Sequence, residues 1–437
     1  MSISHHKVKI AIGFLLSLMF SNSQAVLMIT TYAGTGTGGF SGDQAAAANA
    51  QLNAPTDVLA DALGNLYISE QNNNRIRKVD ANGNITTFAG DGTAAFGGDQ
   101  YQAIQASFDQ PVALALSPNG DTLYIADKQN NRIRQINLMT NIITTIAGSG
   151  VRGYTGDGGL AVDARLSLPQ GLAVDTNGNI YISDSSNQVI RMLEISSGLI
   201  STIAGNGQTP LTNPPLNGAD IGDGAPAISA SLNNPQGLAI DNANNTLYIA
   251  DSSHSRIRKV DLSSGLISSV IGDNGLGFSS GTRLSAATVK QPWGLVLAKN
   301  GDLFFSDQSA SDVRAIHFET QTVTTIISNA DLNGPQGINI DDNDALYVAD
   351  RRNNRIRTTA NSNTPLNTVT TNNAAGNTTN PNNQSDVDSG TGGSMGGVVS
   401  TQFDSAAPLS KRLTIQPIYL TVVGGKPQVR YAARVPL

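Results

Sequence analysis

The sequence predicts an all-β protein, a six-bladed β-propeller built from four-stranded antiparallel blades. Three observations lead to this prediction: a six-residue string recurs, a proline opens each repeat, and one copy of the string precedes the first complete repeat. The string Ile-Thr-Thr-Ile-Ala-Gly at 143–148 returns with small changes at 85–90, 200–205, 267–272 and 323–328. The opening prolines, spaced 56, 58, 66, 57 and 43 residues apart, are Pro55, Pro111, Pro169, Pro235, Pro292 and Pro335. Four strands repeating at such a period are typical of propeller blades.

Each repeat contains four strand-like segments in a fixed order. The first follows the proline, as in Gly171-Leu172-Ala173-Val174-Asp175, the second ends on an acid, the third carries an arginine, and the fourth is the recurring string. Short strands rich in Ile, Val, Tyr and Thr, separated by Asn-Gly turns such as Asn82-Gly83, are typical of antiparallel meanders. We therefore expect six sheets of four strands.

The unpaired copy of the string lies at Ile29–Gly34, ahead of the first repeat. The last repeat runs through Asn354-Arg355-Ile356-Arg357 and then enters an Asn/Thr-rich tract without a copy of its own. We expect the N-terminal strand at 28–34 to complete the last blade. Such a closure removes the exposed sheet edges that an open ring would leave.

The segments on either side of the repeats have other compositions. Residues 1–25 combine His and Lys, the apolar run Ile10–Phe20 and the small residues of Ser23-Gln24-Ala25, which predicts a cleaved signal peptide and an exported protein, periplasmic or extracellular. The propeller is expected to occupy 26–360. A linker rich in Asn, Thr and Gly, without Lys or Arg, is expected at 361–405 because such a tract buries too little surface to fold.

The last segment, 406–437, is short and basic. Its alternating run Leu413–Val423, interrupted by Pro417, suggests a hairpin that docks on the acidic propeller or on another chain. No segment after the signal peptide approaches the roughly 20 apolar residues that a membrane helix needs, so no membrane span is expected.

Composition excludes several kinds of function. The chain of 437 residues is 39% hydrophobic, which suffices for a large core, and it has no cysteine, which excludes thiol catalysis and cysteine-ligated metal sites. The formal charge is −6, and residues 26–360 carry about 30 acids against about 20 bases, roughly −10. We expect such a body to repel nucleic acid and anionic lipid.

The repeat from Pro235 through Leu247-Tyr248-Ile249-Ala250-Asp251 to Arg256-Ile257-Arg258 resembles an NHL repeat, and the resemblance covers roughly residues 28–360. A more distant similarity links it to gluconolactonase-type propellers. The resemblance implies the propeller fold, but it does not specify an activity, because propellers of this family serve as binding platforms, lyases and sensor domains.

A repeated acid and arginine indicate a scaffold role. The acid ends the second strand of every blade, and seven residues later comes an arginine, which gives the ring Arg77, Arg134, Arg191, Arg258, Arg314 and Arg357. Constancy in all six blades favours internal ion pairs over a ring of arginines presented to anionic ligands. A second element, Gly-Asp at Asp43, Asp99, Asp157 and Asp223, is expected to cap short helices, with a calcium role as the weaker alternative.

The sequence lacks the metal-binding residues that the known enzymes of similar fold use. The zinc-dependent lyases need several histidines around the channel, whereas the chain after residue 25 has His254 and His317, which we expect to be solvated surface residues. The calcium-dependent lactonases place Asn, Asp or Glu immediately before the glycine of the first strand. That position here reads Thr56, Val112, Gln170, Gln236, Trp293 and Gln336, and Asp57, one place further on, is expected to point away from the channel.

These residues define the candidate site. The long loops, Asn-rich turns and prolines are expected on one face of the ring, because the ends of antiparallel strands alternate between faces. At the channel mouth on that face, Thr56, Gln170, Gln236, Trp293 and Gln336 would form a neutral collar suited to a saccharide or a peptide; alternatively, Trp293 fills space between blades five and six. We expect a binding scaffold for a protein or small neutral ligand without catalytic residues, cofactor or metal, with a lactonase-like hydrolase or lyase as the alternative.

Overall fold

The structure, a computed structural model, describes residues 29–208, 221–272, 284 and 287–359, and the backbone of 420–423 and 426–429. The predicted signal peptide (1–25) and linker (361–405) lie outside the described residues. The chain divides into two compact units, Met1–Ala374 and Ala375–Leu437. In the second unit, β26 (Leu420–Val423) and β27 (Lys426–Val429) form an antiparallel hairpin within the segment for which a hairpin was predicted.

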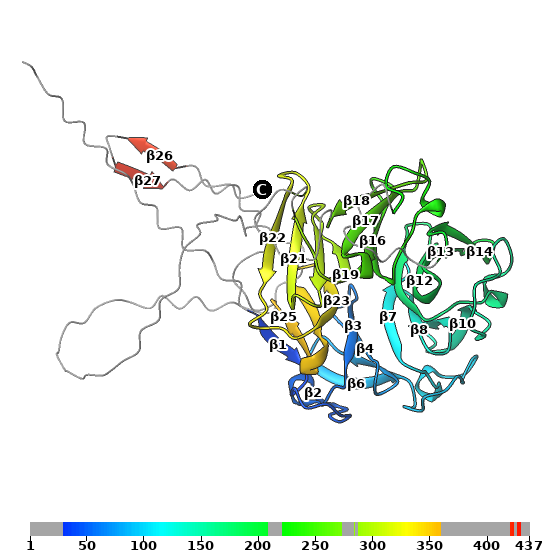
Figure 1. The fold of residues 1–437 in the computed structure, drawn as a ribbon. Coiled ribbons are helices and arrows are strands. Elements are labelled where there is room, and N and C mark those ends of the chain that lie inside the picture. The colour runs from blue at the N-terminus through cyan, green and yellow to red at the C-terminus, as the bar shows by residue number, and fades with distance from the viewer. Residues whose placement is uncertain are drawn as a thin grey trace, which may run out of the picture. The chain divides into compact units, whose positions relative to one another are not determined.

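Six antiparallel sheets of the first unit stand around one axis (Figure 1), so the predicted six-bladed propeller is confirmed. Every inner strand begins at a repeat-opening proline: β3 (Pro55–Ala60), β7 (Pro111–Leu116), β11 (Pro169–Val174), β15 (Pro235–Asp241), β19 (Pro292–Leu297) and β23 (Pro335–Ile340). The second strands end on the repeated acid: β4 (Leu66–Glu70), β8 (Thr122–Asp127), β12 (Ile180–Asp184), β16 (Thr246–Asp251), β20 (Leu303–Asp307) and β24 (Leu346–Asp350). Adjacent inner strands are in contact all the way round the ring.

The outer half of each blade consists of the arginine strand and the recurring string. The third strands are β5 (Arg75–Val79), β9 (Arg132–Asn137), β13 (Val189–Glu194), β17 (Arg256–Asp261), β21 (Asp312–His317) and β25 (Arg355–Thr358). The outer strands are β6 (Asn84–Ala89), β10 (Ile143–Ala147), β14 (Leu199–Ala204), β18 (Leu266–Ile271), β22 (Thr322–Ile327) and, from the N-terminal copy, β1 (Thr30–Ala33). β1 pairs with β25, with Thr30 opposite Thr358 and Thr31 opposite Arg357, which confirms the predicted closure of the sixth blade.

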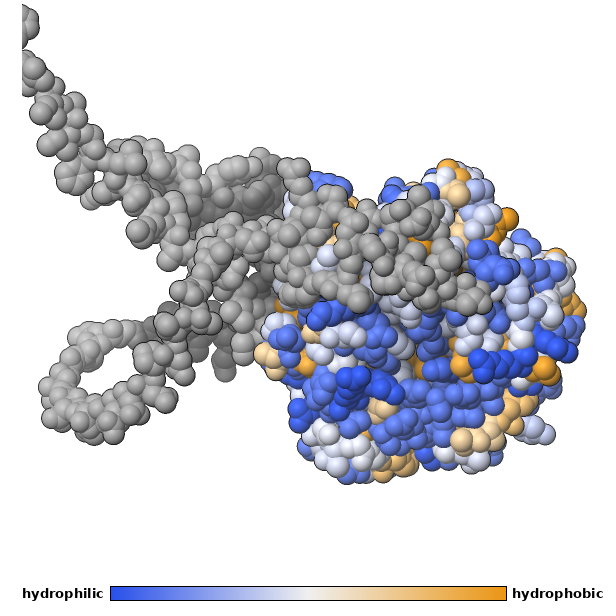
Figure 2. Space-filling view, in the orientation of Figure 1, coloured by the Kyte–Doolittle hydropathy of each residue, from blue (hydrophilic) through white to orange (hydrophobic). Residues whose placement is uncertain are grey.

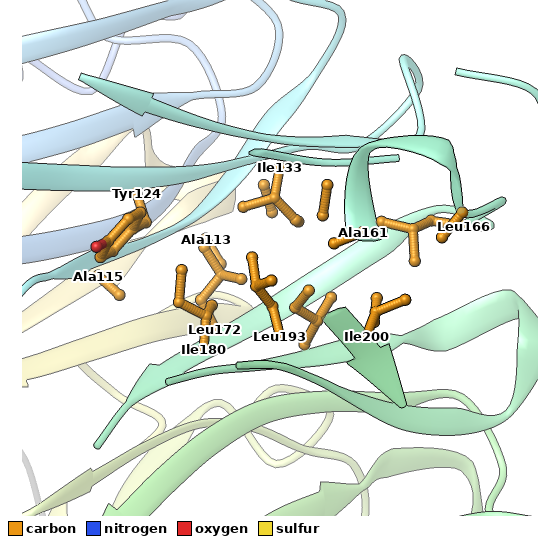
Figure 3. Packing of buried hydrophobic residues seen from close by; sticks show 14 of the residues in the cluster. Ala113, Ala115, Tyr124, Ile133, Ala161, Leu166, Leu172, Ile180, Leu193 and Ile200 are labelled. Carbon is orange, nitrogen blue, oxygen red and sulfur yellow. The ribbon is translucent and has the colours of Figure 1, made fainter. Parts of the chain in front are cut away.

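The hydrophobic core lies between neighbouring blades, because both faces of each blade are covered by the next one. Figure 3 shows one such cluster, in which Ala113, Tyr124 and Ile133 of the second blade meet Leu172 and Leu193 of the third. The clusters found among the described residues correspond to the six junctions of the ring. Each blade is therefore stabilised by its neighbours.

Hydrogen bonds from polar side chains also join neighbouring blades. The hydroxyls of Ser69, Ser183 and Ser306, at one repeat position in three blades, each donate to an inner-strand carbonyl of the next blade at 2.5 Å. Asn side chains in the turn before the third strand join the blades as acceptors: Asn354 Oδ1 accepts from Ala54 N at 2.9 Å across the closure of the ring. These bonds satisfy backbone groups that the inner strands would otherwise bury unpaired.

The repeated arginines form buried ion pairs inside the blades. Arg134 Nη1 lies 3.3 Å from Asp127 Oδ2 and its Nη2 2.7 Å from Asp99 Oδ1, and the arginine side chain is 0% exposed. Arg77, Arg191 and Arg258 are equally buried and pair with the corresponding acids. Burial nevertheless raises the pKa of Asp127 to about 6, because desolvation outweighs its hydrogen bonds and the arginine.

The Gly-Asp loops therefore do not cap helices, and that expectation was wrong. Asp43, Asp99, Asp157 and Asp223 each bind the arginine of the blade that follows in sequence. The 3-10 helices after them, η1 (Ala47–Asn49), η2 (Ala103–Gln105), η3 (Ala161–Asp163) and η5 (Ala227–Ser229), have no side-chain cap. The carboxylate finds a stronger partner in a desolvated guanidinium than in a single turn of helix.

The same loops cover the outer edge of the blades. β2 (Ala45–Ala46) pairs with β6 as a fifth strand, and single bridges at Gln102, Leu160 and Pro226 repeat this contact on the next three blades. The loop aromatics stack on arginines, with the Arg132 guanidinium 3.6 Å from the ring centre of Phe96 and that of Arg75 4.0 Å from Phe40. Covering loops of this kind protect sheet edges from pairing with another chain.

Candidate functional site

The inner strands enclose a cavity of about 380 Å³ on the propeller axis. All six inner strands contribute to its wall. Most of the residues that line it are small or aliphatic, including the half-buried Leu59, Leu116 and Val296, with polar side chains at Asp57, Gln170 and Asn339. Polar and apolar atoms contribute about equally to its surface, and small-molecule sites commonly combine apolar side chains with a few placed polar groups.

Asp57 lies in this cavity, and the expectation that it points away from the channel was wrong. The physical reason is a β-bulge in β3: Pro55 is opposite Glu70 and Asp57 is opposite Ser69, so Thr56 is left out of the register. Such a bulge breaks the alternation of side chains that the expectation assumed. Thr56 consequently turns into the blade junction, where its hydroxyl is 2.9 Å from Ser69 Oγ.

The carboxylate of Asp57, in the first blade, contacts the blades on both sides. Its Oδ2 accepts from Leu114 N of the second blade at 2.8 Å, and its Oδ1 accepts from Val58 N at 2.9 Å. On its other side lies Gly337 of the sixth blade, where any Cβ would overlap the carboxylate. Burial raises the pKa of Asp57 to about 7, although the two backbone hydrogen bonds favour the ionised form.

The collar expected at the channel mouth is only partly assembled. Gln170 and Trp293 line the cavity with half-buried side chains, and Trp293 belongs to none of the clusters between blades. Thr56 and Val112 also border the cavity, but both are buried, and the Thr56 hydroxyl is engaged in the blade junction. Gln236 and Gln336, in contrast, are 0% and 4% exposed and do not line it. The bulges in β15 and β23 place both residues of the Gln-Gly pair outside the register, so side-chain direction there does not follow strand alternation.

Asn339 is a second polar residue that the sequence did not single out. It lies in β23 of the sixth blade, and its Oδ1 accepts from Ala60 N at 3.1 Å, across the closure of the ring. The position carries aliphatic residues or Ala in the other blades, so an amide there was a usable signal. The same holds for Asp57, the one acid at a position that is Gly or Ala elsewhere.

The other predicted residues lie away from the cavity. Arg77, Arg134, Arg191, Arg258 and Arg314 are 0% exposed, and Arg357 forms an ion pair with Asp350 at 3.6 Å, so the ring of arginines faces the interior of the blades. Both histidines are also engaged, which corrects the expectation of solvated residues: His254 Nδ1 is 2.9 Å from Asp251 Oδ2, and His317 Nδ1 is 2.7 Å from Asp302 Oδ2.

Within the described part of the chain, no group of three or more His, Asp or Glu side chains could hold a metal ion. Likewise, none of the described helices is long and apolar enough to cross a bilayer. The visible surface is mostly hydrophilic, with small scattered hydrophobic areas (Figure 2), so the axial cavity is the better-defined candidate site.

The geometry of the cavity can serve two kinds of chemistry. A ligand would meet a carboxyl group whose pKa burial raises to about 7, one indole ring, and amide groups among aliphatic side chains. These groups can bind by hydrogen bonds and charge, and the carboxyl group can also exchange a proton at neutral pH.

Two family models match this chain. The model described as Teneurin NHL domain matches residues 44–137, 150–220 and 203–285, which together exceed half of the chain, and the NHL repeat model matches residues 332–358. Both matches fall on the propeller.

Curated relatives match over the same region. SUPPRESSOR OF QUENCHING 1 of Arabidopsis thaliana is 27% identical over 333 residues, covering 71% of this chain and 30% of that protein. Human NHL repeat-containing protein 2 is 25% identical over 62% of this chain and 40% of its own length. Mouse Teneurin-4 is 32% identical over 50% of this chain and 8% of its own length. The chain thus spans less than half the length of these relatives.

Solved structures share the fold at low identity. An auxiliary nutrient binding protein from Bacteroides ovatus has a TM-score of 0.54 at 16% identity, covering 76% of this chain and 75% of that one. A gluconolactonase from Xanthomonas campestris has a TM-score of 0.50 at 13% identity, covering 76% of this chain and 90% of that one. At these identities the likeness concerns the fold.

Proposed function

Because the chain belongs to the NHL-repeat family of β-propellers, we propose that it is a binding protein whose axial cavity receives a small molecule or the tip of a peptide. The observation that carries the proposal is the cavity of about 380 Å³, lined by all six inner strands and containing Asp57, Gln170 and Trp293. A rigid ring with a pre-formed cavity loses little conformational freedom on binding, which favours affinity.

We further propose that the protein acts after export, in the periplasm or outside the cell. The proposal is supported by the signal-peptide pattern of residues 1–25. The fold similarity to a nutrient-binding protein agrees with a role in which an exported propeller captures a small solute.

The chain offers a direct test, because Trp293 is its one tryptophan and lines the cavity. Fluorescence excited at the red edge of indole absorption therefore reports on the cavity alone. The mature protein would be titrated with saccharides, short peptides and small amines, and a melting curve would be recorded with each. The proposal expects a saturable change in emission together with a raised melting temperature. Ligands that raise the melting temperature but leave the emission unchanged would place the site elsewhere.

One observation favours a second candidate function, a hydrolase of the lactonase type. A carboxyl group with a pKa of about 7 inside a cavity is suited to act as a general base. Lactone and ester substrates would be hydrolysed by the native chain, and Asp57→Asn would abolish the activity. Substrates that bind without turnover would leave the protein as a binding module.

A further inference from the structure

The cavity contains a single charged group. Asp57 is the one ionisable side chain among the residues that line it, and no lysine, arginine or histidine faces it there. Its pKa is set by burial and by two backbone hydrogen bonds, with no charged side chain among the causes. Arg77, Arg134, Arg191 and Arg258 are paired with other acids. A negative charge that is withdrawn from water without a cationic partner is costly to the fold.

The other groups of the wall can pack against the apolar part of a ligand whose charged part binds Asp57. The wall also contains half-buried aliphatic side chains, among them Leu59, Leu116 and Val296. Trp293 adds an indole ring, which attracts cations through its face and packs against apolar groups equally well. The combination of a carboxylate, an aromatic ring and an aliphatic wall is complementary to an organic cation.

A metal ion fits this wall less well. Calcium takes six to eight oxygen ligands, usually including several carboxylates, whereas the lining offers one carboxylate, whose two oxygens already accept backbone hydrogen bonds. An ammonium or guanidinium group needs fewer partners, and each carboxylate oxygen retains a lone pair for it.

Resting on the proposed binding function, we infer that the ligand carries a primary ammonium or guanidinium group on a small apolar body. The cation binds the Asp57 carboxylate, and the body packs against the aliphatic side chains of the wall and against Trp293. The acidic propeller body, roughly −10 over residues 26–360, adds long-range attraction for such a cation.

The ionisation of Asp57 gives the binding a pH dependence with a defined sign. The carboxyl group is neutral below its pKa of about 7 and ionised above it. The affinity for a cation should therefore rise as the pH increases from 5 to 8, whereas the affinity for a neutral analogue should not. The residues placed against Asp57 are Ser69 opposite it in β4, Leu114 in β7 and Gly337 in β23, none of which carries a charge, so none of them reverses this sign.

A pair of isosteric probes tests the inference. Benzylammonium and benzyl alcohol differ in one charged group, and an alkylammonium group stays protonated throughout this pH range. Both would be titrated into the full mature chain at pH 5 and pH 8, with Trp293 emission and calorimetry as readouts. At pH 8 we expect benzylammonium to bind at least roughly tenfold more tightly than benzyl alcohol, as for one charge-assisted contact, and this preference to disappear at pH 5.

Two variants complete the design. Asp57→Ala introduces the residue that the second blade carries at this position, Ala113, and should abolish the preference for the cation. Glu319→Gln removes an exposed acid outside the cavity and should leave the preference intact. If Asp57→Ala does not fold, the pH series on the unmodified chain decides the question.

The outcomes separate this inference from the proposed function. Equal affinity for the two probes at pH 8, or a preference that survives in Asp57→Ala, would overturn the cation inference while the binding function stands. If neither these probes nor saccharides and peptides change the Trp293 emission or bind by calorimetry, the binding function fails together with the inference.

Discussion

Replacing Arg134 by methionine should cost the fold about 3 to 5 kcal/mol, the usual result of removing one partner of a buried ion pair. The Arg134 guanidinium donates to Asp99 Oδ1 from Nε at 3.0 Å and from Nη2 at 2.7 Å, and to Asp127 Oδ2 at 3.3 Å. Methionine retains most of the side-chain length and apolar contact. The loss of stability therefore measures the removal of the charge rather than the creation of a cavity.

The size of the effect comes from the carboxylate that remains. Asp127 is 0% exposed, and without Arg134 it keeps only the bonds from Asp109 N and the Asn130 amide, both at 2.9 Å. Burial already raises its pKa to about 6, and removal of the arginine would raise the pKa further. The destabilisation should therefore be smaller at pH 5, where Asp127 is protonated in the variant, than at pH 8.

Urea unfolding followed by circular dichroism at both pH values measures the effect. Lys299→Met is the matched control, because it breaks the exposed pair between Lys299 and Asp342, whose atoms are 3.1 Å apart, and should cost less than about 1 kcal/mol. Adding Asp127→Leu to Arg134→Met should restore part of the lost stability by removing the unpaired acid. If Arg134→Met costs no more than the control, the buried pairs do not stabilise the blades.

Three further predictions concern the ring and its cavity. A chain lacking residues 1–34 should melt at lower temperature than one lacking residues 1–25 and should aggregate in light scattering, because loss of β1 exposes the edge of β25; equal behaviour would contradict the closure. Gly237→Ala should cost about 1 to 3 kcal/mol in urea unfolding, since its Cβ would overlap the Trp293 carbonyl, whereas Gly159→Ala should be nearly neutral. Asp57→Ala should stabilise the protein more at pH 8 than at pH 5, because the raised pKa penalises only the ionised form; an unchanged difference in melting temperature would rule out burial of this charge.

The architecture could be predicted from the sequence because every level of it repeats. The prolines mark the first residue of all six inner strands, and the displaced string at Ile29–Gly34 predicted the closing strand β1. Because the pattern occurs six times, a local exception can be recognised by comparison with the other copies. The missing fourth strand of the last blade is such an exception, and it pointed to the closing strand.

The cavity was less predictable because the bulge at its mouth breaks the rule on which side-chain directions depend. Strand alternation placed Thr56 inward and Asp57 outward, whereas the Thr56 hydroxyl bonds Ser69 in the blade junction and Asp57 lines the cavity. The Gly-Asp loops were misassigned for another reason: the partner of Asp99 is Arg134, 35 residues further along the chain, and helix-capping rules consider neighbours within one turn.

The most direct test of the account is a crystal structure of the mature chain grown with benzylammonium at pH 8. The account predicts density for the ligand on the propeller axis, with its nitrogen within hydrogen-bond distance of the Asp57 carboxylate and its ring beside Trp293 and the aliphatic side chains of the wall. An empty cavity, with the ligand bound instead on the outer loops or at a blade edge, would contradict it.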